Sequence, residues 1–209
     1  MGVIQRRERE KLEMRQLIVD AAIKMYLEEG YEKLTLRGIA KQIEYAPGTI
    51  YLYFKDKDAL FHAMHEWAFE RLFEKFSTLA TIKDPILRLK ELGFTYIQFA
   101  FDNPELYDLM FILTEPMCAR DNHEGWECGF KVYGFLRATV EECFNKKLLR
   151  GDSVDVIAFS MWSMVHGMVS LKLRNRLDIY DKINVPKDFD KENLIKASVE
   201  MMYNLFILK

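Results

Sequence analysis

The scarcity of residues that interrupt helices constrains the fold of this chain more than any other feature. Only five prolines and ten glycines occur in 209 residues. Pro47, Pro85 and Pro104 stand where a helix can begin, because the first turn does not need the N–H that proline lacks. Long stretches rich in Leu, Glu, Lys, Ala, Phe and Met separate these breaks, and most of these residues favour helices. We therefore predict an all-α protein of about nine helices.

Apolar residues at helical spacing place the predicted helices along the chain. The first covers about residues 6–29 and ends at Gly30, and a short second one follows the N-cap Thr35. A third covers 47–53 and a long fourth continues to about residue 79. Later helices are predicted over 85–101, 104–113, 123–147, 153–175 and 190–207, with a loop over 114–122 and irregular structure over 176–189.

Length and composition fit a small head, residues 1–57, joined by the fourth helix to a larger body, residues 58–209. The first residues, MGVIQRRERE, lack the apolar segment of a signal peptide, and no apolar run approaches the roughly 18 residues of a membrane span. Cys118, Cys128 and Cys143 have no paired spacing, which indicates neither a disulfide framework nor a zinc site. We expect a cytoplasmic protein with reduced thiols, no cofactor and no membrane partner.

The net charge of −2 is divided unevenly between these two parts. Residues 1–57 carry eleven Lys or Arg against nine Asp or Glu, whereas residues 58–209 carry nineteen against twenty-three. The basic excess of the head is small, since nucleic-acid-binding domains are usually more basic. Charge alone does not identify DNA as a partner.

The first three predicted helices have the arrangement of a helix-turn-helix unit, which places its last helix in the major groove. Ile50 and Phe54 are four residues apart and are expected to pack inward. The polar tips of Thr49, Tyr51 and Tyr53 are then expected to point outward. Gly48 lets the backbone approach DNA closely, which places Thr49 to reach a base edge.

The segment IAKQIEYAPGTIYLYFKDKDAL, residues 39–60, resembles the signature of TetR-family regulators. The matching positions are Thr35, Ile39, Ala40, Gly48, Thr49, Ile50, Tyr51, Tyr53, Phe54, Lys57 and Leu60. The resemblance implies that Tyr51, Tyr53 and Lys57 hold DNA phosphates, and Lys57 also stands at a helix start where the dipole favours an anion. Thr35 and Arg37 are placed to clamp the neighbouring DNA backbone or to reach the groove.

The turn departs from the family pattern, because Glu44, Tyr45 and Ala46 replace the usual glycine, small aliphatic residue and serine cap. Glu44 requires either a left-handed backbone or a rearranged turn. Pro47, which we also expect at the DNA surface, compensates for the missing cap by fixing the helix start. Two interpretations of Tyr45 stay open: it reaches DNA, or it closes the turn.

The start of the chain forms a charged arm with Arg6, Arg7, Arg9, Lys11 and Arg15. One interpretation is that the arm lies along phosphates or enters a minor groove. The other, slightly favoured, is a solvated helix end, because Glu8, Glu10 and Glu13 are interleaved with these cations.

A looser resemblance continues through YIQFAFDNPELYDLMF, residues 96–111, and WSMVHGMVSL, residues 162–171. It implies a body that binds a small, usually apolar molecule among its middle helices and forms a homodimer through its last two long helices. Large aromatic, Met and His side chains suit such a pocket, although for each of them a place in the core is the better expectation. The candidates are Phe94, Phe101, Tyr107, Met110, Phe111, Tyr133, Phe159, Trp162 and His166.

The function predicted from these features is a DNA-binding repressor, released from double-stranded operator DNA when the small apolar effector shifts the spacing of its two heads. The fourth helix joins the two sites. An enzyme is not expected, because the chain lacks a P-loop, a dinucleotide fingerprint, H-E-x-x-H and G-x-S-x-G. The alternatives are a helical enzyme or a binding module that keeps the fold without reading DNA.

No metal is expected at two irregularly spaced clusters: His62, His65 and Glu66, and Cys118, Asp121, His123, Glu124 and Cys128.

Overall fold

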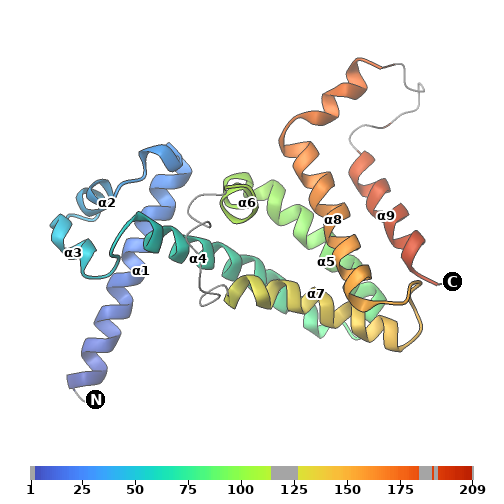
Figure 1. Cartoon of the computed structure of the whole chain (residues 1–209), viewed down its shortest axis with the longest axis horizontal. Helices are drawn as coiled ribbons and strands as arrows, with labels where there is room; N and C mark the ends of the chain where they lie inside the picture. The colour runs from blue at the N-terminus through green and yellow to red at the C-terminus, as the bar shows by residue number, and fades with distance from the viewer. Residues whose placement is uncertain (1–2, 114–126, 184–189, 191–192, 209) are drawn as a thin grey trace. The chain divides into compact units, whose positions relative to one another are not determined.

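The computed structural model describes residues 3–113, 127–183, 190 and 193–208 (Figure 1). Within these residues the regular secondary structure is helical, apart from one isolated backbone bridge between Leu149 and Ile207, and turns and loops join the helices. The all-α prediction is confirmed. The helices are α1 (Val3–Glu29), α2 (Leu36–Gln42), α3 (Pro47–Tyr51), α4 (Lys57–Thr78), α5 (Pro85–Asp102), α6 (Pro104–Phe111), α7 (Glu127–Asn145), α8 (Val154–Leu173) and α9 (Leu194–Phe206).

Contacts divide the chain into two compact units. Unit 1 comprises Met1–Glu70 and Glu105–Trp126, and unit 2 comprises Arg71–Pro104 and Glu127–Lys209. Unit 1 therefore contains α1 to α3, the larger part of α4 and nearly all of α6, and unit 2 contains the end of α4 with α5, α7, α8 and α9. The functional division at residue 57 stays a prediction, because compactness and function need not divide a chain at the same residue.

Unit 1 is held together by an apolar core and by two buried polar groups that bind the ends of α6. Ile18, Ile39 and Ile50, from three different helices, are fully buried. The Tyr26 hydroxyl donates to the Glu105 carbonyl at 2.9 Å. His65 Nε2 lies 3.1 Å from the Met110 carbonyl oxygen, and since a carbonyl only accepts, Nε2 carries the proton.

Unit 2 is built around α5, which packs against α7 and α8. Asp84 caps α5 by accepting from the Ile86 N–H at 2.9 Å, and Pro85 occupies the first turn, as predicted. α9 is fixed on α5 by Tyr203, whose hydroxyl donates to the Leu89 carbonyl at 2.8 Å. A Cβ atom added at Gly93 would overlap this hydroxyl.

Several predicted helix ends differ from the structure by a few residues: α1 begins at Val3 rather than at about residue 6, and α6 and α8 each end two residues early. Two other differences have a clear local cause. α3 ends at Tyr51 rather than at residue 53, because a turn follows at once. α9 begins at Leu194 rather than at Asp190, because the Asp190 carboxylate accepts from the Asn193 N–H at 3.0 Å and closes a turn before the helix. A 3-10 helix over Arg176–Asp181 occupies part of the predicted irregular segment. The predicted loop at 114–122, the predicted helix start at 123 and most of the cysteine cluster lie outside the described residues.

One helix also corrects the expectation about apolar runs. α8 is long and apolar enough to cross a membrane by length and composition alone. Core helices pass the same test, and in unit 2 α8 packs against α5, α7 and α9. Val156 and Phe159 nevertheless leave more than half of their surface exposed, so α8 carries an apolar face that the described part of the chain does not cover.

Candidate functional site

The turn between α2 and α3 keeps a regular backbone geometry although its residues are unusual. Glu44 has φ 60°, which is the left-handed region. The Tyr45 N–H donates to the Ala40 carbonyl at 2.9 Å, and the Glu44 N–H donates to the Lys41 carbonyl at 3.3 Å. These are the two bonds of a Schellman motif, in which glycine is the usual left-handed residue. Of the two possibilities predicted for Glu44, the structure has the left-handed backbone.

α3 begins without a side-chain cap and depends on its proline. Ala46 occupies the N-cap position and makes no side-chain hydrogen bond there, while Pro47 occupies the first turn. Ile50 and Phe54 are buried, with at most 2% of either residue exposed, which confirms that they pack inward. The short helix is therefore held by its buried side and by the proline.

The outward side of α3 carries most of the predicted DNA contacts. Tyr45, Pro47, Gly48 and Tyr51 are exposed, whereas Thr49 and Tyr53 are half-buried. A Cβ at Gly48 would meet no atom within 4 Å. Packing within the protein therefore does not require a glycine at Gly48, and a close approach by another molecule gives a reason for one.

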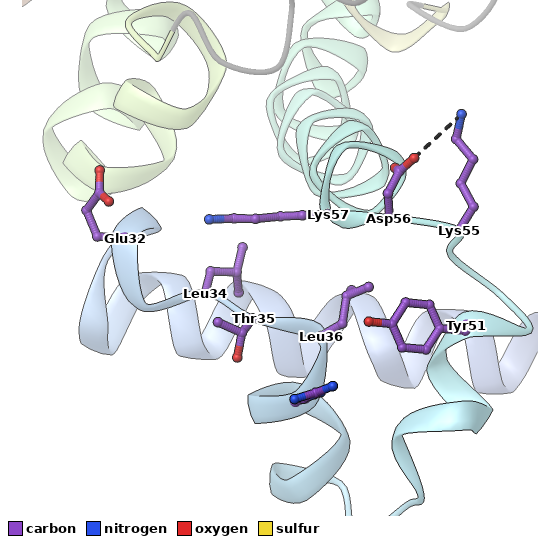
Figure 2. A pocket seen from close by; sticks show the side chains of 9 residues that line it. Glu32, Leu34, Thr35, Leu36, Tyr51, Lys55, Asp56 and Lys57 are labelled. Atoms are coloured by element: carbon purple, nitrogen blue, oxygen red, sulfur yellow. Dashed lines mark ion pairs between the residues drawn. The ribbon is translucent and has the colours of Figure 1, made fainter.

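A shallow hollow of about 640 Å³ lies beside α3 (Figure 2). Its lining is rich in cations and hydrogen-bond donors, since Arg37, Lys55 and Lys57 lie there with Thr35 and Tyr51. Glu32 and Asp56 also line the hollow, and Lys55 Nζ lies 3.6 Å from an Asp56 carboxylate oxygen. Thr35 Oγ1 accepts from the Gly38 N–H at 3.0 Å and so caps α2, as predicted. With three cations against two carboxylates and two hydroxyl groups beside them, the lining offers donors to an anionic group such as a phosphate.

Lys57 has an internal role that the sequence did not reveal. Its ammonium donates to the Tyr31 carbonyl at 3.0 Å and lies 3.7 Å from the centroid of the Tyr31 ring. An ammonium has three N–H donors, so the contact with Tyr31 leaves capacity for an anion. Lys57 thus ties the start of α4 to the turn after α1, and its phosphate contact stays a prediction. No local pattern reveals a partner 26 residues away.

Two further contacts were missed in the sequence. Asp56 caps α4, because its carboxylate accepts from the Ala59 N–H at 2.7 Å; an Asp directly before an apolar helical pattern was the available signal. Arg15, predicted as part of the arm, places its guanidinium 5.0 Å from the centroid of the Phe54 ring. α1 is thereby connected to the segment that directly follows α3.

Three of the nine predicted ligand residues belong to unit 1. Tyr107 and Met110 are buried in its core. The Phe111 ring lies 5.3 Å from that of Tyr107 and 5.4 Å from that of Phe69, measured between centroids. These contacts give the three residues a packing role, and their part in ligand binding stays a prediction.

Four other predicted ligand residues form an aromatic row in unit 2, from α7 and α8. The Trp162 ring lies 5.8 Å from Tyr133, 6.4 Å from Phe159 and 6.1 Å from His166, between centroids. Tyr96, which was not among the candidates, places its hydroxyl 2.8 Å from His166 Nδ1. Burial lowers the pKa of His166, so the imidazole is neutral at pH 7.

The last two predicted ligand residues, Phe94 and Phe101, line a second hollow in unit 2. It has a volume of about 560 Å³ and lies between α5 and the start of α9, where Ile195 and Lys196 complete it. Glu91, Thr95, Ile97 and Gln98 also line it. Its mixed lining offers apolar surface beside one cation and one carboxylate, which suits an amphiphilic molecule.

Two family models match the chain. The model "Bacterial regulatory proteins, tetR family" matches residues 18–64, and "Tetracyclin repressor-like, C-terminal domain" matches residues 89–188. The first match contains α2, α3 and the turn between them. The second contains most of α5 and all of α8, which carry Tyr96, Trp162 and His166.

Curated relatives align mainly over a short part of their length. The fatty acid metabolism regulator protein of Bacillus subtilis is 40% identical over 73 residues, which is 33% of this chain and 38% of the relative. The HTH-type transcriptional repressor Rv1474c of Mycobacterium tuberculosis is 40% identical over 58 residues, 28% of this chain and 31% of the relative. The chain spans about a quarter to about half of the length of the relatives it matches.

Solved structures share the fold over nearly the whole chain. The transcriptional regulator FadR of Bacillus subtilis, in complex with stearoyl-CoA, has a TM-score of 0.66 at 19% identity, covering 91% of this chain and 98% of that one. The TetR-family regulator PfmR of Thermus thermophilus has a TM-score of 0.59 at 15% identity, covering 90% of this chain and 97% of that one. At these identities the likeness establishes the fold alone.

Proposed function

Since this chain belongs to the TetR family of bacterial regulatory proteins, we propose that it is a homodimeric repressor that acts in the cytoplasm and binds operator DNA through α3. The observation that carries this proposal is the construction of the α2–α3 unit. Its inner side is closed by Ile50 and Phe54, while its outer side presents Gly48, Thr49 and Tyr51 beside the cationic hollow. An exposed surface with a small excess of cations and several hydroxyl groups fits the phosphates and base edges of a major groove.

The unusual turn does not weaken this proposal. The residues that depart from the family pattern, Glu44 to Ala46, retain the two turn hydrogen bonds and the left-handed backbone that a glycine would supply. The departure therefore changes the energy of the turn and the side chains beside the DNA, not the direction in which α3 leaves the turn. The unusual turn therefore gives no support to the alternative function, a binding module that keeps the fold but does not recognise DNA.

A pool of random duplexes tests DNA reading directly. Selection with the full chain is expected to enrich a near-palindromic site whose half-sites lie about 10 base pairs apart, because the two heads of a dimer dock in successive major grooves. Tyr51→Phe and Tyr53→Phe each remove one hydroxyl from both heads of the dimer and should weaken binding roughly 5- to 150-fold, the value of two hydrogen bonds. A pool without enrichment would overturn the proposed function.

The proposed homodimer forms through α8 and α9. Both helices expose large apolar side chains: Val156 and Phe159 on α8, and Met201 and Leu205 on α9. Large exposed apolar faces mark interaction sites, and helices that pack in pairs across a two-fold axis bury such faces in both copies. Val156→Glu is expected to turn the dimer into a monomer in sedimentation experiments; a variant that remains dimeric would contradict this interface.

The proposed effector is a small apolar molecule bound in unit 2. The aromatic row of Tyr133, Phe159 and Trp162 supplies apolar surface, and the neutral His166 with Tyr96 supplies a polar group. The relative solved with stearoyl-CoA supplies the first probe, stearoyl-CoA itself, whose acyl chain is the apolar part that the aromatic row would hold. We expect it to bind the full chain and to weaken duplex binding by the same factor by which duplex weakens its own binding, as linkage requires. If calorimetry shows the same affinity for stearoyl-CoA with and without duplex, the proposed regulation of DNA binding by the effector is contradicted.

A further inference from the structure

The first half of α1 continues past the compact part of unit 1 as an exposed helix. Residues 4 to 13 are all exposed, whereas Ile18 is fully buried. Figure 1 shows this part of α1 running on beyond α2 and α3. The helix therefore presents side chains that no described part of its own unit covers.

Among the described residues, the ion-paired and the unpaired charged residues of this extension lie on different sides of the helix. Arg6 pairs with Glu10 at 3.4 Å, and Arg9 pairs with Glu13 at 3.4 Å. Within the described part of the chain, Arg7 and Lys11 take part in no ion pair. The acids of the arm are thus largely neutralised on one side, which leaves Arg7 and Lys11 as cations on the other.

Helix geometry places those cations on the side of α1 that faces the rest of its unit. Arg7, Lys11 and Arg15 are four residues apart and fall within an arc of roughly 80°, at 3.6 residues per turn. The buried Ile18 falls within the same arc. The side that packs against the core thus continues beyond it as a row of cations, with Glu8 at its margin.

The row is tied to the DNA-reading segment at Arg15, which lies over Phe54, three residues after the end of α3. From there, Lys11 and Arg7 lie roughly 6 and 12 Å further along the axis, at 1.5 Å per residue. A span of roughly 12 Å corresponds to three or four base steps of a duplex, at 3.4 Å each. We propose that Arg7 and Lys11 form a second DNA contact, on the phosphate backbone beside the bases that α3 reads.

This inference rests on the proposed function, and its test separates the two. The full chain is titrated with the duplex enriched from the random pool over a range of salt concentrations. In Arg7→Gln/Lys11→Gln, four phosphate contacts per dimer are lost, and the slope of log affinity against log salt should fall by about 3.6, at about 0.9 per contact. The matched control Arg6→Gln/Arg9→Gln makes the same charge change on the same helix and should alter the slope by less than about 1.

Each outcome decides the proposal. A loss of slope confined to the Arg7 and Lys11 variant supports it. Equal losses in both variants would mean a general effect of charge, and no loss in either would mean a solvated helix end; both results overturn the second contact while the proposed function stands. If the wild-type chain binds the enriched duplex no better than random duplex, the second contact and the proposed function are both overturned. Circular dichroism verifies that glutamine, a good helix former, leaves α1 helical.

Discussion

Replacing Glu44 with glycine should stabilise the protein, because Glu44 holds a left-handed backbone with a side chain that disfavours it. Its φ is 60°, and this conformation costs an L-residue about 1–2 kcal/mol. Glycine avoids that cost but loses about 0.5–1 kcal/mol more conformational entropy on folding than alanine. The expected net gain in the free energy of unfolding therefore lies between about 0 and 1.5 kcal/mol, with a central value of about 0.7 kcal/mol.

The control for this change is Glu44→Ala, which removes the carboxylate but keeps a Cβ in the same strained backbone. Urea unfolding of the full chain, analysed at equal m-value, gives the difference between the variants. Hydrogen exchange over residues 36–51 locates it, because strain relief at the turn should slow local opening of α2 and α3. If Glu44→Gly is no more stable than Glu44→Ala, the reasoning from backbone strain is refuted.

Three further changes test other parts of the structure. Gly93→Ala should lower the free energy of unfolding by about 1–3 kcal/mol, because the new methyl group displaces the Tyr203 hydroxyl; Gly134→Ala, where a Cβ meets open space, is the control and should not destabilise. Ala46→Ser should add about 0.5–1 kcal/mol by capping α3, and an unchanged urea midpoint would contradict this. Burial lowers the pKa of His166, so the unfolded chain binds that proton more readily and stability should fall as the pH drops through about 6.5. His166→Gln should flatten that part of the pH profile of the urea midpoint, and an identical profile would show that His166 is not responsible.

Features encoded within a few residues were predictable from the sequence. The N-cap Thr35, the proline starts of α3 and α5, and the inward packing of Ile50 and Phe54 all depend on neighbours along the chain, and the structure contains each of them. The unusual residue Glu44 was also recognisable from its sequence neighbours, because the family pattern has a glycine at its position. Local rules thus predicted the regular parts of the head and marked Glu44 as unusual, but they left two conformations of its backbone open, and the structure has the left-handed one.

Contacts between distant residues were not predictable in the same way. The Lys57 ammonium donates to the carbonyl of Tyr31, 26 residues earlier. The His65 imidazole contacts the carbonyl of Met110 near the end of α6, 45 residues later. Tyr203 fixes α9 on α5 across 114 residues. Side chains with polar tips find such partners only once the helices pack. For the same reason, apolar periodicity did not separate a ligand pocket from a core, and the nine predicted ligand residues fall into groups in both units.

The most direct test of the central claim is the affinity of the full chain for the enriched duplex, divided by its affinity for random duplex, in the wild type and in Gly48→Ala. Specific recognition predicts a wild-type ratio of roughly 10³ or more. Gly48→Ala should lower the affinity for the enriched duplex at least tenfold without loss of stability, because the added Cβ meets nothing in the free protein and would meet the DNA in the complex. A wild-type ratio near one, or a Gly48→Ala variant that binds like the wild type, would contradict recognition by α3.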